Sequence, residues 1–307
     1  MTLALGTLNF GNIIKKKEAI RIISVFRDNA YKIIDTSPNY GNRLSEKILG
    51  EILTKNRKDF YIATKLGLEL SKNSNIYNYK PILTKKYIIN SVDRSLRNLN
   101  TDYIDLIQLH AFNVDNRIEE VIEVLMHLKK VGKVNHIGSV NFNLSQINKF
   151  ETIKKDFFST VQIHYNFHER KAEKYLINYC MNNKKEIFLN RIFGSGIFIN
   201  DSNIIKKRMF SSIRLQKKYI KLKSQIDLIN NFCQKKSLDI VHFYLSWMYY
   251  SNFNKKIIVG ISNPNQLNNI IYLYNNIIKK KTISKIEKSY INLFKNKCYN
   301  LPKTFHE

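Results

Sequence analysis

Cysteine, glycine and proline are scarce in this chain of 307 residues, and long apolar runs are missing. The 3 cysteines, Cys180, Cys233 and Cys298, are far apart and lack the spacing of a metal site. We therefore expect reduced thiols and a cytoplasmic location. No run of about 20 apolar residues occurs, so we predict no membrane span. The N-terminal segment MTLALGTLNFGN lacks the pattern of a secretory signal.

The formal net charge of +27 is the strongest compositional bias. One explanation is a polyanionic partner, such as nucleic acid or an anionic surface. The other is genome composition, because the chain has only 10 glycines and 4 prolines, which GC-rich codons encode, and is rich throughout in Lys, Asn and Ile. The lysine runs Lys15–Lys17 and Lys279–Lys281 are short and separate. We favour genome composition and predict no specific nucleic-acid binding, with polyanion binding as the weaker alternative.

Short apolar runs that resemble buried parallel strands recur along the chain. They are Leu3–Phe10, Lys32–Asp35, Phe60–Lys65, Tyr103–His110, Asn135–Val140, Thr160–Tyr165, Glu186–Arg191 and Lys256–Ile261. Longer segments with helical periodicity follow them, at Glu18–Asn29, Leu44–Leu53, Lys85–Asn98, Ile118–Val131, Leu144–Thr152, Ala172–Asn182, Gln216–Cys233, Leu238–Tyr249, Gln266–Ile278 and Ser284–Phe294.

This alternation predicts an α/β fold of the (β/α)8 TIM-barrel class, as a single domain over residues 1–307. A doubly wound open sheet is the competing fold, but it normally carries G-x-G-x-x-G after a first strand, and the sequence has no such motif. Two segments between a strand and the next helix, Leu66–Leu83 and Phe193–Leu215, are predicted as long loops. Loops of this length at the strand ends of a barrel are often functional.

Four ionisable residues fall at or just after the ends of predicted strands. Asp35 ends the second run, Tyr40 lies in the loop that follows, Lys65 ends the third run and His110 ends the fourth. Each of them alone is more typical of a turn, a packing contact or a solvated loop. Because successive parallel strands end at the same barrel mouth, we expect all four to converge there.

An acid, a phenol, an amine and an imidazole together suit proton transfer. An ammonium group stabilises a nearby phenolate, and a carboxylate keeps that ammonium charged and oriented. An imidazole can orient a carbonyl, so the set can protonate a developing alkoxide. Reducing a carbonyl to an alkoxide also needs a hydride, which no side chain supplies. A nicotinamide cofactor and a small carbonyl substrate are therefore implied.

Several segments resemble the aldo-keto reductase family across nearly the whole chain and in family order. They are IIDTSPNYGNRLSEKILGEIL, ATKLG, SVDRSLRNLNTDYIDLIQLH, VGKVNHIGSVNF, VQIHYNFHER and IIVGISNPNQL. The resemblance implies an NAD(P)H-dependent oxidoreductase that reduces an aldehyde or ketone to an alcohol. NADPH is the expected cofactor, with NADH as the alternative.

The resemblance also implies roles for individual residues. Tyr40 would be the general acid, Lys65 would lower its pKa, Asp35 would pair with Lys65, and His110 would position the carbonyl. Asn141 and Gln162 match the residues that hold the nicotinamide carboxamide. The implied contacts with the rest of the cofactor come from Gly194, Ser195 and Gly196 at the pyrophosphate and from Gly260, Ser262 and Gln266 at the adenosine end.

The sequence departs from the family pattern at a few positions near the expected cofactor site. Val140 replaces a serine, Asn190 and Arg191 stand where many members have a stacking aromatic, and Asn269-Ile270 replaces a Glu-Asn pair. Potassium-channel beta subunits resemble the same family, so a slow, cofactor-binding regulatory or scaffold protein is the alternative function. We predict no metal site, and the sequence indicates no oligomeric state.

Overall fold

The computed structural model describes residues 1–70, 79–111, 117–199 and 213–294. Eight strands form a closed barrel in the order β1-β10-β9-β8-β7-β6-β3-β2, which confirms the predicted (β/α)8 fold class. Their bounds are β1 Thr2–Gly6, β2 Ile33–Asp35, β3 Tyr61–Leu66, β6 Ile104–Leu109, β7 Val134–Val140, β8 Thr160–His164, β9 Glu186–Asn190 and β10 Lys256–Gly260. Each of these strands lies within a predicted apolar run or extends it by one residue.

Helices separate the strands along the chain. They are α1 Lys16–Asp28, α2 Leu44–Leu53, α3 Lys85–Leu99, α4 Ile118–Lys130, α5 Leu144–Ile153, α6 Leu176–Asn182, α8 Ile213–Lys235, α9 Ile240–Tyr250, α10 Pro264–Asn275 and α11 Lys280–Phe294. Local chemistry explains several starts: Thr84 caps α3, Asp239 caps α9, and Asn143 forms a capping box with Gln146 at α5. None of the described helices is long and apolar enough to cross a bilayer.

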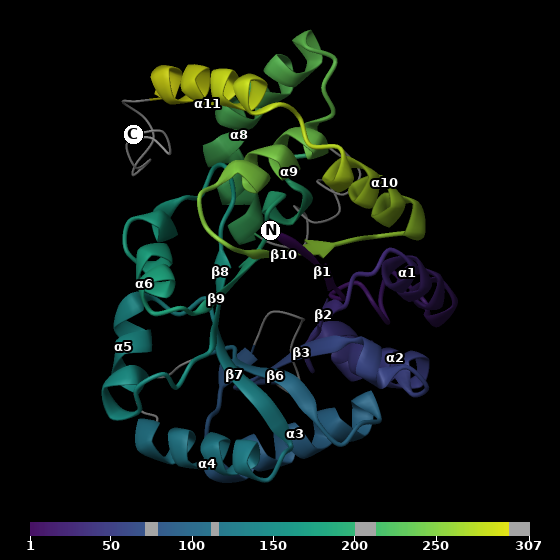
Figure 1. Cartoon of the computed structure of the whole chain (residues 1–307), viewed down its shortest axis with the longest axis vertical. Helices are drawn as coiled ribbons and strands as arrows, with labels where there is room; N and C mark the ends of the chain where they lie inside the picture. Colours follow the sequence, from purple (N-terminus) through teal and green to yellow (C-terminus); the bar gives the residue numbers. More distant parts are fainter. Residues whose placement is uncertain (71–78, 112–116, 200–212, 295–307) are drawn as a thin grey trace. The chain divides into compact units, whose positions relative to one another are not determined.

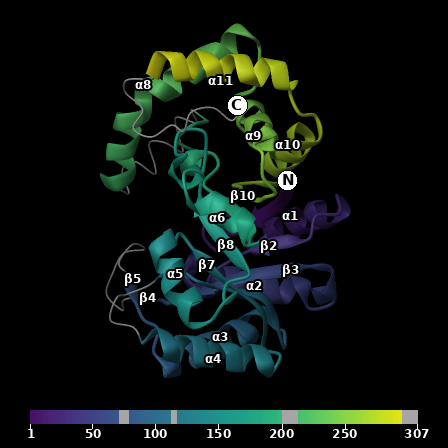
Figure 2. The same cartoon turned by 60° about the vertical axis from the view of Figure 1, so that its left-hand side comes forward.

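The chain forms two compact units. The first comprises residues 1–163, 175–190 and 254–267 and holds the barrel, with α1 to α6 on the outside of the ring of strands (Figure 1). The second comprises residues 164–174, 191–253 and 268–307, in which α8, α9 and α11 pack together (Figure 2). A buried ionic cluster lies in the second unit, where Arg170 pairs with Glu173 and Glu287, each at 2.8 Å.

The barrel interior is filled by side chains in layers. One layer is apolar and consists of Ala4, Ile33, Ala63, Leu106, Phe188 and Ile258. Successive side chains of a strand alternate between its two faces, so the residues two positions further along face the interior again. On three of these strands those residues are Asp35, Lys65 and Gln108, all buried. The interior therefore changes from apolar to polar towards the carboxyl ends of the strands.

Two expectations about local structure were wrong. Leu66–Leu83 was expected to be a loop, but it carries the antiparallel strands β4 (Leu68–Leu70) and β5 (Tyr79–Pro81), whose pairing is not encoded in local periodicity. Ala172–Asn182 was expected to be one helix, but it divides into the 3-10 turn η3 (Lys171–Glu173) and α6. Glu173 at the end of η3 accepts a hydrogen bond from Arg170, which also pairs with the distant Glu287, and this long-range pairing is not visible in the helical pattern.

Candidate active site

The predicted acid, amine and imidazole lie at the carboxyl ends of neighbouring strands. Asp35 is the last residue of β2, Lys65 lies near the end of β3, and His110 directly follows β6. The strand register places Asp35 opposite Ala63 and Lys65 opposite Gln108. The backbone N–H of His110 donates to the Leu66 carbonyl at 2.8 Å, which ties the residue to the end of β3. All three therefore meet at one mouth of the barrel.

The side chain of Lys65 is the centre of this site. Its Nζ donates to both carboxylate oxygens of Asp35, at 2.7 and 2.8 Å, and to the Thr36 carbonyl at 2.8 Å. It also donates to the phenol oxygen of Tyr40 at 3.3 Å. Lys65 is 1% exposed and Asp35 is 2% exposed. The structure therefore brings the predicted acid, amine and phenol into direct contact.

The surroundings of Lys65 keep it positively charged. Burial disfavours the ammonium form, but the Asp35 carboxylate and the Tyr40 hydroxyl outweigh burial and hold the pKa of Lys65 above its ordinary value of 10.5. The residue is therefore an ammonium at neutral pH. A positive charge therefore lies 3.3 Å from the hydroxyl oxygen of Tyr40.

Tyr40 begins the short 3-10 segment η1 (Tyr40–Arg43), which leads into α2. Its N–H donates to the Ser37 carbonyl at 3.0 Å. The next three residues, Gly41, Asn42 and Arg43, have φ values of 56°, 53° and 71°. Asparagine and especially arginine are uncommon in the left-handed region, so the conformation of this turn is imposed by its surroundings.

A buried hydroxyl network supports the segment between β2 and Tyr40. Ser45 Oγ lies 2.9 Å from Thr36 Oγ1 and 2.8 Å from Thr7 Oγ1. The hydroxyl of Thr7 donates to the Asp35 carbonyl at 3.1 Å. These bonds join β1, the end of β2 and the start of α2. They hold the backbone on both sides of the predicted catalytic residues.

Gln108 belongs to the site, although it was not among the predicted site residues. Its Nε2 donates to Asp35 Oδ1 at 3.4 Å, and the residue is fully buried. Gln108 lies two positions before His110, so strand alternation places the two side chains on the same face. This two-residue spacing from His110 is the sequence feature that could have identified Gln108 as a site residue. The other amide atom, Oε1, is buried and has no hydrogen-bond partner among the described residues.

Asn141 and Gln162, the predicted carboxamide contacts, lie side by side at the same end of the barrel. Asn141 follows β7 with a φ of 58°, and its N–H donates to the Gln162 carbonyl at 2.8 Å. Gln162 is 2% exposed, and its Oε1 has no hydrogen-bond partner within the described part of the chain. A buried acceptor of this kind suits a ligand amide N–H. The neighbouring strand β9 ends in Asn190, whose Oδ1 is also buried and unpaired among these residues.

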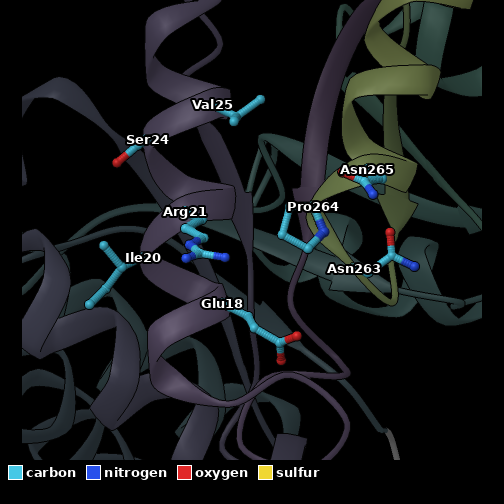
Figure 3. Close-up of a pocket in the computed structure, with 8 residues that line it drawn as sticks. All are labelled: Glu18, Ile20, Arg21, Ser24, Val25, Asn263, Pro264 and Asn265. Atoms are coloured by element: carbon cyan, nitrogen blue, oxygen red, sulfur yellow. The ribbon is translucent and has the colours of Figure 1, made fainter.

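The residues predicted for the adenosine end surround the turn between β10 and α10. Gly260 ends β10, the Ser262 N–H donates to Gln266 Oε1 at 2.7 Å, and the Gln266 N–H donates to Asn263 Oδ1 at 2.9 Å. This turn borders a cavity of about 650 Å³. Figure 3 shows Glu18, Arg21 and Val25 of α1 on one side of it and Asn263, Pro264 and Asn265 on the other.

The predicted pyrophosphate loop belongs to the second unit, whereas every other predicted site residue belongs to the first. Gly194, Ser195 and Gly196 form the 3-10 turn η4, with φ values of 58°, 63° and 90°. A Cβ on Gly194 would lie 2.4 Å from the ring of Phe198, so glycine is required there. Among the described residues, no group of three or more histidines, cysteines or acids has the geometry of a metal site.

Comparison with known proteins identifies the family. The sequence pattern of the Aldo/keto reductase family matches residues 2–291. The chain is 34% identical over 185 residues to Aldo-keto reductase YhdN of Bacillus subtilis, which covers 60% of this chain and 54% of that protein. It is 21% identical over 320 residues to the putative aryl-alcohol dehydrogenase AAD16 of Saccharomyces cerevisiae, covering 94% and 93%. The match to YhdN, like that to several other curated relatives, spans about half the length of the relative.

Solved structures show the same fold. The glycerol dehydrogenase AKR11B4 from Gluconobacter oxydans superimposes with a TM-score of 0.78 at 21% identity, over 99% of this chain and 95% of that one. The holo form of the aldo-keto reductase AKR11C1 from Bacillus halodurans gives a TM-score of 0.74 at 20% identity, over 93% and 91%. Because the family pattern extends over nearly the whole sequence, the chain belongs to the aldo/keto reductase family.

Proposed function

We propose that the protein is an NAD(P)H-dependent oxidoreductase that reduces an aldehyde or ketone to an alcohol. The observation that carries the proposal is the buried Lys65 ammonium, which joins the Asp35 carboxylate to the Tyr40 hydroxyl. Family membership supports the same reaction class. We also propose a cytoplasmic location, which rests on the few, widely spaced cysteines of the sequence.

In the proposed mechanism Tyr40 gives its proton to the oxygen of the substrate carbonyl. The Lys65 N–H donates to the phenol oxygen, so the phenol's own proton is not used in that contact. As this proton leaves, the ammonium stabilises the negative charge that develops on the Tyr40 oxygen. Asp35 keeps Lys65 charged and in place, and His110 orients the carbonyl. A reduced nicotinamide, when bound, supplies the hydride.

The chain's own residues offer partners for such a cofactor. The unpaired Gln162 Oε1 suits the amide N–H of a carboxamide, and the exposed Asn141 beside it has an amide group to donate in return. We assign the pyrophosphate to the backbone of Gly194, Ser195 and Gly196 and the adenosine end to Gly260, Ser262 and Gln266. NADPH is the proposed cofactor, with NADH as the alternative.

The test begins with fluorescence titration of the purified protein with NADPH and with NADH. Steady-state oxidation of the nucleotide that binds is then measured with each of a panel of aldehydes and ketones as the substrate, with Tyr40→Phe as the matched variant. We expect cofactor binding in both proteins and turnover that falls about 10²-fold or more in Tyr40→Phe. Binding without turnover in the wild-type protein would instead support a regulatory or scaffold role. Absence of binding by either nucleotide would contradict the proposal.

A further inference from the structure

A second cavity, of about 250 Å³, borders the turn that carries Tyr40. Its walls include Asn39, which precedes Tyr40, and Arg43, which ends η1. The opposite wall is one face of α3, because its residues there follow helical spacing: Tyr87, Asn90, Ser91, Arg94 and Ser95. Tyr40 itself does not line the cavity. The cavity therefore lies beside the catalytic turn and is separate from the buried Lys65 centre.

The walls carry more basic than acidic side chains. The basic ones are Arg43, Arg94 and Lys86, and the acidic ones are Glu46 and Glu69. Arg43 and Arg94 are close enough that, after burial, Arg94 is the main cause that lowers the pKa of Arg43. Like charges that face the same space favour an anion between them.

Glu46 attracts Arg43, but its carboxylate oxygens are already bound by other groups. It is fully buried, and its two carboxylate oxygens accept hydrogen bonds from Thr64 Oγ1 at 2.8 Å and Asn98 Nδ2 at 3.1 Å. Burial raises the pKa of Glu46, although its attraction to Arg43 acts in the opposite direction. Arg43 Nε is buried and has no hydrogen-bond partner among the described residues. A buried guanidinium nitrogen in this state needs an acceptor.

The start of α3 also borders the cavity. Thr84 caps the helix by accepting the Tyr87 N–H at 3.3 Å, and both residues line the cavity with Lys86. The first N–H groups of a helix have no intrahelical acceptor and favour negative charge. They reinforce the arginines but do not by themselves define a site.

We propose that this cavity binds a small oxyanion, a phosphate or a carboxylate group, between Arg43 and Arg94, and that occupancy adjusts the turn that carries Tyr40. The link is covalent and short, because Arg43 is the last of three successive left-handed residues that follow Tyr40. A ligand held by the Arg43 side chain restrains the end of that turn. The effect on catalysis rests on the proposed function, whereas the binding site does not.

The binding test uses thermal unfolding and calorimetry of the full chain with inorganic phosphate and, separately, acetate, against sodium chloride at the same ionic strength. We expect a saturable rise in Tm of about 2 °C at ten times the Kd for at least one oxyanion. The response to acetate distinguishes a carboxylate site from one that requires phosphate. Arg94→Gln should abolish the response, because it removes one of the two arginines proposed to hold the anion. Arg94 is exposed on α3, so we expect the variant to fold normally.

The matched control is Arg97→Gln, on the same helix but outside the cavity, which should keep the full response. An equal loss in both variants would overturn the proposed site, since the net charge alone would then explain binding. A wild-type response no larger than that to sodium chloride would overturn it as well.

Carbonyl turnover is measured with and without phosphate in wild type and Arg94→Gln. Phosphate should change kcat only in the wild type. Saturable binding in a protein without any turnover would reject the reductase but leave the anion site standing.

Discussion

The Lys65 ammonium lies 2.7 and 2.8 Å from the two carboxylate oxygens of Asp35, and both side chains are almost completely buried. The strands that carry them are neighbours in the barrel. Inside a protein such a pair contributes little net stability as a whole, but each charge depends strongly on the other. This dependence leads to a distinctive pattern of mutational effects.

Replacing one member of the pair should cost more than replacing both. We expect Lys65→Met to lower the free energy of unfolding by about 3–5 kcal/mol, because it leaves the Asp35 carboxylate buried without its partner. The double variant Asp35→Asn/Lys65→Met should regain most of that loss. Urea unfolding of the three proteins measures the difference. A double variant less stable than Lys65→Met would show that the pair is not energetically coupled in this way.

Gln108 should position Asp35 and so affect the low-pH side of the pH dependence of kcat. Its N–H donation favours the charged form of Asp35, so Gln108→Leu should raise the pKa of that carboxyl. We expect the low-pH limb of the kcat profile to move to higher pH, with the KM for the carbonyl substrate nearly unchanged. A uniform loss of kcat at every pH would instead indicate general damage to the barrel mouth.

Glu46 should make stability depend on pH. Burial raises its pKa above the ordinary value of 4.5, so the folded protein binds the proton more tightly than the unfolded chain does. The free energy of unfolding should therefore fall as pH rises from about 4.5 through the folded pKa. Glu46→Gln should flatten this part of the profile, as measured by urea unfolding between pH 4 and pH 8. An unchanged slope would assign the dependence to other groups.

The side chain of Gln162 should matter for cofactor binding more than for folding. Its Oε1 has no partner among the described residues, so Gln162→Leu removes no hydrogen bond made by that atom. We expect stability to change by less than about 1 kcal/mol, while the Kd for NADPH rises about 3- to 10-fold, the equivalent of one lost hydrogen bond. The measurements are thermal unfolding and fluorescence titration. A large loss of stability with an unchanged Kd would assign Gln162 a structural role.

Raising the pH should weaken the contribution of Lys65 to the free energy of unfolding only in strongly alkaline solution. Asp35 and Tyr40 hold the pKa of Lys65 above its ordinary value, so this contribution is complete below about pH 10 and is lost as pH rises through the folded pKa. Thermal unfolding of wild type and the Asp35→Asn/Lys65→Met variant from pH 7 to pH 11 should show a steeper alkaline decline in the wild type. Parallel declines would mean that Lys65 does not control it.

Local patterns were enough to predict most of the secondary structure. All eight barrel strands lie at the predicted apolar runs, and α2 has the predicted bounds, Leu44–Leu53. Hydrophobic periodicity reports which residues are buried, and this depends mainly on near neighbours in the sequence. The hairpin of β4 and β5 was missed because it depends on cross-strand pairing. The break before α6 was missed because the turn there is held by Arg170, whose other partner is the distant Glu287.

The sequence by itself determined the barrel and the kinds of groups at its mouth, because alternating strands and helices place strand ends together. Only the tertiary structure decided how those groups meet. Lys65 and Asp35 are separated by 30 positions, and their contact depends on strand register and on burial. Gln108 likewise contacts Asp35 because of strand register and burial. The like-charged pair Arg43 and Arg94 also emerged only in three dimensions, where a left-handed turn and one face of α3 border a common cavity.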